Sequence, residues 1–405
     1  MATSSAPNSV EQRNGRLRIA FVYPAYWPYV RRGVERLIHD LGAYLATRGH
    51  DVHVFCGKPG PARVEQSDGM TIHYFSLHYS PLAMAYLPWL YVYRFGLDTV
   101  TALMKGNFDV LHIFTYSFAF SAPLLQRFRH IPYVFHAVMD DPGMSGGFSK
   151  WMYERLLCQA DQVATLTQRG ADLISDRFGI TPVVLPPPVN MEEFRPCAER
   201  DKAHPIVLFP GDLGDERKGG YLLLRAWNEI HRQRPEARLV LAGPYGLAWN
   251  SGIRAFLSAI PNIVLDPAAR AAIEVRGTGT LADVPAMYAS ASVTVLPSIN
   301  ETFGMAVTES LACGTPVVCS DDAGPNEILA GNCAIGRTVP LHEAHDLWSA
   351  RSVGPLMKAV LGALDLSQDP ETTAACRKHA EQWSIPTVGA RAEAIYDSVL
   401  RVAAR

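Results

Sequence analysis

The feature that most constrains the fold of this chain is the alternation of short apolar segments with longer amphipathic ones. In the first half, the clearest helical pattern covers residues 34–48 and ends at Gly49. Strands that alternate with helices predict a parallel sheet with right-handed crossovers, so the expected fold class is α/β. The strands predicted in the first half are 18–23, 51–56, 70–74, 110–113, 133–136 and 162–166.

A proline cluster divides this pattern into two halves. Neither a helix nor a central strand can continue through Pro182 and residues 186–188, and the strand pattern restarts at Pro205. A chain of 405 residues is expected to form two domains. The strands predicted in the second half are 205–209, 238–242, 292–296 and 316–319. The predicted organisation is a disordered leader at 1–15, a first domain at 16–186, a second domain at 187–382 and a C-terminal helix at 383–405 that crosses back to the first.

Composition favours a soluble enzyme. The chain is 48% hydrophobic and 19% charged with a net charge of -2, which is ordinary for a globular protein and gives no support for a nucleic-acid partner. Seven cysteines without metal or disulfide spacing are typical of a reducing compartment. The leader has no apolar core of a signal peptide, and no apolar run is long enough to span a bilayer. We therefore expect a cytoplasmic protein.

An aromatic stretch at 79–95 leaves three interpretations open: a buried helix with an aromatic cap, the lining of an acceptor cleft, or contact with a membrane surface. The first domain shows no obvious basic amphipathic stretch beside it. Membrane association is accordingly possible but not favoured, and the buried helix is the preferred interpretation.

Two glutamates eight positions apart, Glu301 and Glu309, follow a predicted buried strand. Open parallel sheets bind ligands beyond the carboxyl ends of their strands, and the N-terminus of the next helix attracts a diphosphate. Phe303, Gly304 and Met305 would supply backbone amides to it. Carboxylates accept hydrogen bonds from hydroxyl pairs, so Glu301 suits a hexose and Glu309 suits a ribose. The alternative is a helix with two solvated acids.

The sequence around these glutamates resembles the retaining glycosyltransferases of family 4. The resemblance is clearest over residues 281–329, in 297–298, 314–318 and 324–327, and it extends more weakly over nearly the whole chain. It implies the GT-B fold, which has two Rossmann-like parallel-sheet domains with an interdomain cleft. It also implies the transfer of a hexose from a nucleotide diphosphate sugar, without a metal or other cofactor.

Lys218 follows the first predicted strand of the second half and precedes a glycine and a helix. A lysine at this place can neutralise a diphosphate leaving group. The family usually has an arginine directly after the preceding glycine, and this chain has Asp212 there. A carboxylate would repel the phosphates unless it pairs with a cation, and Arg217 could pair with it and supply the missing charge.

Candidate residues of the first domain rest on the same resemblance. Gly33 lies where the family has a glycine pair close to the donor phosphate, and Arg32 replaces the first glycine. Upstream, Tyr26 and Trp27 would form a wall for an acceptor ring. His136 ends a predicted strand where the family places a histidine against the transferred sugar; a lone histidine there is otherwise structural. His112, at the end of the preceding strand, is a further acceptor-side candidate.

No metal site is predicted, because the adjacent acid pairs 140–141 and 321–322 lack the D-x-D spacing of metal-dependent transferases. The expected partners are a nucleotide sugar donor and a small-molecule acceptor, such as a natural-product scaffold or a cyclitol. Two alternatives remain open. One is a catalytically silent sugar-nucleotide-binding partner, for which Asp212 is the argument. The other is a sugar-nucleotide epimerase or a phosphorylase on the same scaffold.

Overall fold

The computed structural model shows a chain of two compact units. Unit 1 comprises Met1–Pro188 and Val388–Arg405, and unit 2 comprises Val189–Thr387. The chain therefore returns to unit 1 at its C-terminal end. The residues that the structure describes are 15–30, 33–58, 60–76, 88–138, 147–197, 200–213, 215–243, 265–277, 283–347 and 349–403.

The sheet of unit 1 has the strand order β3-β4-β2-β1-β5-β6-β7-β8, parallel except for β3, which runs antiparallel to β4. The six strands predicted for this half are confirmed. β3 and β8 were not predicted, because β3 is polar and mostly exposed and β8 has two residues. The strands are β1 (Arg18–Val22), β2 (Asp51–Lys58), β3 (Arg63–Ser67), β4 (Met70–Ser76), β5 (Val110–Ile113), β6 (Tyr133–Ala137), β7 (Gln162–Thr165) and β8 (Val183–Val184).

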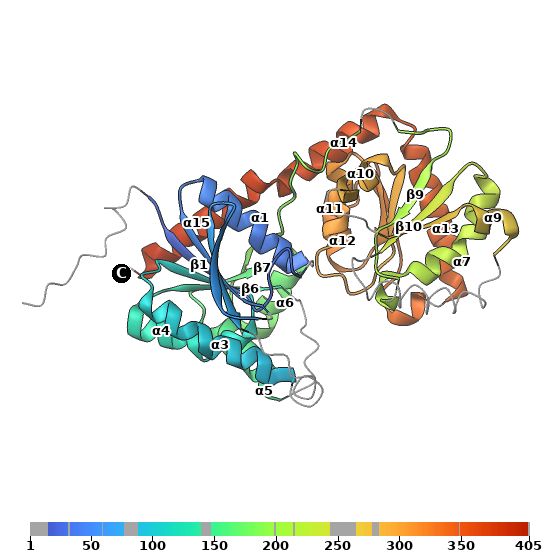
Figure 1. Ribbon diagram of the computed structural model, residues 1–405. Helices are drawn as coiled ribbons and strands as arrows, with labels where there is room; N and C mark the ends of the chain where they lie inside the picture. The colour runs from blue at the N-terminus through green and yellow to red at the C-terminus, as the bar shows by residue number, and fades with distance from the viewer. Residues whose placement is uncertain are drawn as a thin grey trace, which may run out of the picture. The chain divides into compact units, whose positions relative to one another are not determined.

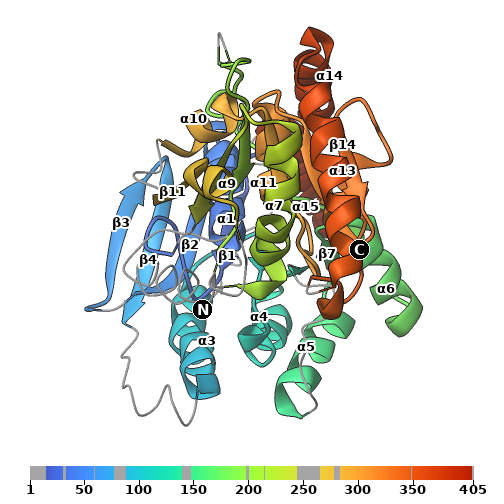
Figure 2. The same cartoon turned by 90° about the vertical axis from the view of Figure 1, so that its right-hand side faces the viewer.

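Helices cover both faces of this sheet. In Figures 1 and 2, α3, α4 and α5 lie together on one side of the strands, and α1 and α15 lie on the other side. Among the described helices, none is both long and apolar enough to cross a membrane. The helices of unit 1 are α1 (Gly33–Thr47), α3 (Pro88–Lys105), η2 (Tyr116–Phe118), α4 (Ser121–Arg129), α5 (Phe148–Gln159), α6 (Gln168–Phe178) and most of α15 (Ile385–Ala403).

The central strand β1 is apolar at successive positions because both of its faces are buried. Ala20 and Val22 belong to the core cluster shared with α3, α4 and α5. Phe21 points to the other face, where its ring approaches Gly42 of α1 and His112 of β5. A strand buried on both faces needs apolar residues at every position, which removes the alternation seen in half-exposed strands.

Unit 2 has the strand order β11-β10-β9-β12-β13-β14, and these strands pair in parallel. The four strands predicted for this half are confirmed. The elements are β9 (Ile206–Phe209), η3 (Glu216–Lys218), α7 (Gly220–Gln233), β10 (Arg238–Gly243), α9 (Pro267–Ala271), β11 (Ile273–Gly277), α10 (Asp283–Ser290), β12 (Val293–Leu296), α11 (Met305–Ala312), β13 (Val317–Ser320), α12 (Ala323–Leu329), β14 (Gly336–Val339), η5 (Ala344–Leu347), α13 (Ala350–Leu366), α14 (Pro370–Ala380) and η6 (Glu381–Trp383).

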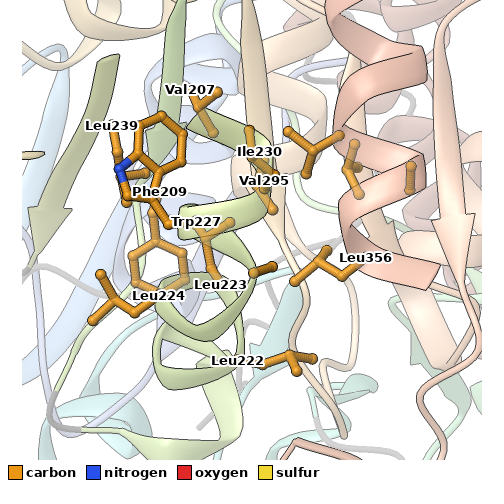
Figure 3. Close-up of a cluster of buried hydrophobic side chains, with 14 of the residues drawn as sticks. Val207, Phe209, Leu222, Leu223, Leu224, Trp227, Ile230, Leu239, Val295 and Leu356 are labelled. Atoms are coloured by element: carbon orange, nitrogen blue, oxygen red, sulfur yellow. The ribbon is translucent and has the colours of Figure 1, made fainter. Parts of the chain in front are cut away.

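The core of unit 2 lies between its sheet and the helices α7 and α13 (Figure 3). Trp227 of α7 is fully buried there beside Phe209 of β9. The indole Nε1 donates a hydrogen bond of 2.9 Å to the carbonyl oxygen of Ala269, so the buried tryptophan leaves no polar group unpaired. This packing fixes the position of α7, and therefore of the loop that precedes it.

Both sheets have a point where the strand order reverses direction. In unit 2 the chain proceeds outward from β9 to β10 and β11, and then returns to β12 on the other side of β9. In unit 1 the same reversal places β5 beside β1. Ligands of open α/β sheets bind at this reversal, beyond the carboxyl ends of the two strands. The loops after β9 and β12, and after β1 and β5, are therefore where a ligand site is expected.

Candidate functional site

The loops that follow β9 and β12 are joined to each other in unit 2. The backbone N–H of Ile299 donates a 2.9 Å hydrogen bond to the carbonyl oxygen of Arg217. Gly219 has a φ of 73°, and a Cβ atom on it would lie 2.3 Å from the carbonyl oxygen of Pro297. A glycine is required here by both backbone conformation and space. The contact places Lys218 beside the residues that follow β12.

Lys218 and Glu301 form an ion pair between Nζ and Oε2 across these two loops. Their side chains are 25% and 21% exposed, so the pair is partly shielded from water yet open to a ligand. An ammonium beside a carboxylate at a strand-order reversal offers two groups of opposite charge to one ligand. A phosphate would bind the lysine, and a hydroxyl pair would bind the carboxylate.

Arg217 makes its side-chain contacts with Asp215. Its Nη2 lies 2.7 Å from Oδ2 and its Nε lies 3.2 Å from Oδ1 of that residue, and the guanidinium is exposed. Arg217 was expected to pair with Asp212, but in the structure its guanidinium pairs with Asp215. Asp212 itself is exposed in the first part of the loop that follows β9.

The backbone around Glu301 is held by residues of the next strand–helix turn. Asn300 has a φ of 52°, a left-handed conformation that asparagine tolerates, and its N–H donates a 3.0 Å hydrogen bond to Oδ2 of Asp322. The N–H of Gly324 donates a 3.1 Å hydrogen bond to the carbonyl oxygen of Glu301. A Cβ on Gly324 would lie 2.4 Å from Cα of Phe303, so this glycine allows the two turns to touch.

The helix after this loop, α11, begins at Met305 with Gly304 as its N-terminal cap residue. Gly304 has a φ of 93°, and Phe303 is buried with its ring 6.4 Å from that of Trp383. The N–H groups that open a helix lack intrahelical acceptors, which suits an anion. Glu309 is half-buried in the second turn of the same helix. The predicted donor residues between Glu301 and Glu309 thus occupy one loop–helix segment, with Lys218 beside it.

The carboxyl end of α11 is capped by two arginines that sequence reasoning did not identify. Arg200 Nη2 donates to the carbonyl oxygen of Cys313 at 2.7 Å, and Arg377 Nη1 donates to that of Ala312 at 2.8 Å. Cations at the C-terminus of a helix satisfy its last carbonyls and complement its dipole. No local pattern marks these arginines, because they come from segments more than sixty residues away.

In unit 1 the structure brings His112 and His136 together. Nε2 of His112 lies 3.2 Å from Nδ1 of His136, and the rings stack with centroids 5.2 Å apart. On its other side, Nδ1 of His112 lies 2.7 Å from the hydroxyl of Tyr396 on α15. All three side chains are fully buried. Tyr396 is a member of the site that the sequence did not indicate, since it lies 284 positions from His112.

Burial determines the charge states of Tyr396, His112 and His136. Desolvation lowers the pKa of His136 to about 3, against an opposing effect from the backbone of Leu185. It also lowers the pKa of His112 well below the usual range, with a further contribution from His136. The pKa of Tyr396 is raised well above its usual value by the same burial. Near neutral pH all three are uncharged.

The direction of the hydrogen bonds then follows from counting protons. A buried phenol must donate its hydrogen, so Tyr396 donates to Nδ1 of His112. A neutral imidazole carries one N–H, which places the proton of His112 on Nε2, from where it is donated to Nδ1 of His136. His136 then carries its own proton on Nε2. Among the described residues this buried atom has no hydrogen-bond partner of good geometry, although the backbone of Leu185 lies close enough to raise the pKa of His136.

The remaining predicted residues of unit 1 lie around β1 and α1. Tyr26 is buried, and its hydroxyl has no hydrogen-bond partner within the described part of the chain. Trp27 is partly buried under the guanidinium of Arg36, 5.6 Å from the ring centroid. Gly33 is the first residue of α1. Arg32 lies outside the described residues, as does most of the aromatic stretch at 79–95.

A second unpartnered polar atom lies in unit 2. Ser298 is fully buried in the loop after β12, and its Oγ has no hydrogen-bond partner in the described part of the structure. Its carbonyl oxygen accepts a hydrogen bond from the hydroxyl of Ser320. In the same described ranges, no three His, Cys, Asp or Glu side chains are grouped so that they could hold a metal ion.

Two protein families match this chain, one in each half. Residues 31–193 match the family described as Glycosyltransferase Family 4. Residues 204–350 match the family described as Glycosyl transferases group 1. The second match contains Lys218, Glu301 and Glu309, and the first contains His112 and His136.

Curated relatives are similar over parts or most of the chain. A D-inositol 3-phosphate glycosyltransferase of Streptomyces bingchenggensis is 32% identical over 48% of this chain, which spans only 45% of that protein. A protein of the same name from Kineococcus radiotolerans is 26% identical, over 72% of this chain and 73% of the relative. A phosphatidyl-myo-inositol mannosyltransferase of Propionibacterium freudenreichii is 23% identical, over 75% of this chain and 77% of the relative.

Solved structures share the fold over almost the whole chain. Sucrose-phosphate synthase from Thermosynechococcus elongatus aligns with a TM-score of 0.74 and 19% identity, covering 96% of this chain and all of that one. HepE of Anabaena, in complex with UDP and glucose, aligns with a TM-score of 0.68 and 15% identity, covering 95% of this chain and all of that one. At these identities the likeness establishes the two-domain GT-B fold.

Proposed function

Because the chain carries a Glycosyltransferase Family 4 domain and a Glycosyl transferases group 1 domain on the GT-B fold, we propose that it transfers a hexose from a nucleotide diphosphate sugar to a hydroxyl of an acceptor. The observation that carries this proposal is the ion pair of Lys218 with Glu301 at the strand-order reversal of unit 2. An ammonium that can bind a phosphate and a carboxylate that can bind sugar hydroxyls lie side by side there, which supports the proposal.

The donor is bound by unit 2. Lys218 Nζ leaves the carboxylate of Glu301 for the diphosphate, and Glu301 then accepts hydrogen bonds from the hexose hydroxyls. The N-terminal amides of α11, at Phe303, Gly304 and Met305, face the diphosphate, and Glu309 binds the ribose. HepE, which shares the fold, is described in complex with UDP and glucose. That neighbour supports a nucleotide sugar as the donor here.

Transfer proceeds with retention of the anomeric configuration and without a metal ion. As the sugar leaves, negative charge builds up on the diphosphate, and Lys218 with the α11 amides stabilises that charge. The acceptor attacks the face from which the diphosphate departs, and a departing phosphate oxygen takes the acceptor proton. His136 donates a hydrogen bond from its Nε2–H to an oxygen of the transferred sugar and keeps that proton. It orients the ring as a neutral donor and is not a general base.

The acceptor is a small polar molecule, and a cyclitol is the favoured class. Two relatives are named as D-inositol 3-phosphate glycosyltransferases, which supports a cyclitol or its phosphate. Another is named as a phosphatidyl-myo-inositol mannosyltransferase, which favours a lipid-linked cyclitol as the second candidate. Tyr26, Trp27, Arg32 and His112 are the proposed acceptor-side residues, with His112 acting through His136. Gly33 is proposed to lie close to the donor phosphate.

A silent sugar-nucleotide-binding protein is the competing function, and Asp212 is the observation in its favour. It lies in the same loop as Lys218, where a carboxylate opposes a diphosphate. The two functions differ in their products. A silent binder binds the donor without releasing nucleoside diphosphate, whereas the transferase releases it when the right acceptor is present. An epimerase would convert the sugar nucleotide without any acceptor.

The test is a calorimetric titration of the purified protein with UDP, GDP, ADP and dTDP, with EDTA or with Mg²⁺. We expect one nucleotide to bind equally in both conditions, and to bind poorly to the Lys218→Ala and Glu309→Ala variants. Arg217→Ala tests the predicted contribution of that guanidinium, which Asp215 holds. Arg232→Ala in the last turn of α7, where Arg232 pairs with Glu229, is the matched control. Binding of no nucleotide would contradict the donor site. Binding that requires Mg²⁺ would contradict the metal-independent mechanism.

Donor hydrolysis and transfer are then followed with the sugar nucleotide of the base so identified. Inositol, inositol phosphate and phosphatidylinositol are offered as acceptors, and the product is analysed for its anomeric configuration. An α-linked product from an α-linked donor is the expected result. Inversion would contradict retention, and binding without turnover of any acceptor would favour the silent binder.

A further inference from the structure

An apolar stripe runs along the exposed side of α4 in unit 1. Phe120, Leu124 and Phe128 are spaced four residues apart, so they follow one another along one side of the helix. They are 44%, 47% and 62% exposed. Leu125, one position after Leu124, points to another side of the helix and is fully buried in the core of unit 1. A surface helix usually needs one apolar side, and α4 has two.

Helix α5 extends this stripe. Trp151 of α5 is 44% exposed, and its ring centroid lies 5.6 Å from that of Phe120. The two helices are tied together at this point, because Nε of Arg155 donates to the carbonyl oxygen of Ala119 at 3.3 Å. Figures 1 and 2 show α3, α4 and α5 lying together on one side of the unit 1 sheet. We call Phe120, Leu124, Phe128 and Trp151 the α4–α5 face.

Basic residues lie on the same two helices as the α4–α5 face. Helices α4 and α5 carry Arg127, Arg129, Lys150 and Arg155 against a single acid, Glu154. That acid is engaged by Arg177 of α6, 3.2 Å away. These two helices are therefore strongly positive in a chain whose net charge is -2. No single stretch of the sequence shows the α4–α5 face, because two helices contribute to it.

We propose that the α4–α5 face binds the surface of an anionic lipid bilayer. Aromatic and leucine side chains enter the boundary between headgroups and acyl chains, while arginine and lysine bind the lipid phosphates. Arg129 and Arg155 already bind protein oxygens, so Arg127 and Lys150 are the cations assigned to the lipid phosphates. Their positive charge selects a bilayer over an apolar protein surface. Attachment is peripheral. This proposal concerns a property other than the transfer reaction, and it does not depend on the proposed donor.

The test is flotation of the purified full chain with vesicles of phosphatidylcholine alone or mixed with phosphatidylglycerol. The apolar variant is Leu124→Ser with Phe128→Ser, and the charge variant is Arg127→Gln with Lys150→Gln. Leu173→Ser on α6 is the matched control, because Leu173 is similarly exposed at 44% and lies outside the α4–α5 face. Circular dichroism and thermal unfolding establish that each variant is folded.

We expect the unaltered chain to float only with vesicles that contain phosphatidylglycerol, and added salt to release it. Each double variant should lower the vesicle partition coefficient by roughly tenfold or more, from the lost apolar area or charge. Leu173→Ser should bind as the unaltered chain does. No binding to anionic vesicles would overturn the proposal. A dimer that dissociates in the apolar variant, without vesicle binding, would assign the face to a second copy of the chain.

Discussion

The hydroxyl of Tyr396 lies 2.7 Å from Nδ1 of His112, so a side chain of the C-terminal helix α15 reaches the central strand β5 of unit 1. This contact determines the tautomer of both buried histidines. Through it, a residue near the end of the chain decides that His136 is a donor at Nε2. The return of the chain to unit 1 therefore has a chemical consequence as well as a structural one.

The substitution Tyr396→Phe should remove the proton that fixes the tautomer of His112. We expect kcat to fall about tenfold and stability to fall by about 1–3 kcal/mol, because Nδ1 loses its buried partner. Nucleotide binding should not change, since Lys218 and Glu309, which are proposed to bind the nucleotide, are in unit 2. The ¹⁵N shifts of the histidine rings report the tautomer directly. Tyr133→Phe is the matched control, a buried phenol bonded to the carbonyl of Leu156. Unchanged ring shifts in Tyr396→Phe would refute the assignment.

The variants Lys218→Ala and Glu301→Gln should separate the binding of the diphosphate from the binding of the hexose. Loss of the ammonium should weaken a nucleoside diphosphate about 10- to 100-fold. Glu301→Gln frees the lysine from its ion pair, so the nucleoside diphosphate should bind as well as before or better. The sugar nucleotide should lose the added affinity that its hexose provides. Calorimetry with the two ligands measures both effects. Equal losses for both ligands in Glu301→Gln would contradict the assigned roles.

Gly219→Ala should disrupt the contact between the β9 and β12 loops. A Cβ there would lie 2.3 Å from the carbonyl oxygen of Pro297, at a backbone φ of 73° that side chains avoid. We expect a loss of about 2–4 kcal/mol in the free energy of unfolding, together with weaker nucleotide binding. Urea unfolding measures the first effect. Gly362→Ala on α13 is the control, because its Cβ would meet only the Arg337 side chain at 3.4 Å.

Stability should fall as the pH is lowered below about 6.5. Burial lowers the pKa of His136 to about 3, so the folded state stays neutral while the unfolded histidine takes up a proton near pH 6.5. Between these values the unfolded state binds more protons, and each such histidine lowers stability by about 1.4 kcal/mol per pH unit. The slope of the unfolding free energy against pH reports the number of protons taken up on unfolding. Between pH 6 and 5, His136→Gln should reduce that number by about one. An unchanged slope would show that His136 is already charged in the fold.

Much of the fold follows from local patterns in the sequence. Ten predicted strands are present. They were predictable because a run of apolar residues bounded by glycine or proline is a local pattern, which can be recognised without knowing the tertiary structure. The segment with Glu301 and Glu309 also forms the expected strand, loop and helix. The polar edge strand β3 was missed because it exposes most of its residues and has no apolar pattern.

The sequence by itself determined the two α/β units and the identity of the charged and imidazole side chains available to a site. Only the tertiary structure decided which of them meet. Lys218 pairs with Glu301 across 83 positions, His112 meets Tyr396 across 284, and Arg200 caps a helix more than a hundred residues away. Such contacts depend on strand order and on the return of α15, which no local pattern encodes. Burial, which sets the protonation of His136, is likewise a property of the assembled fold.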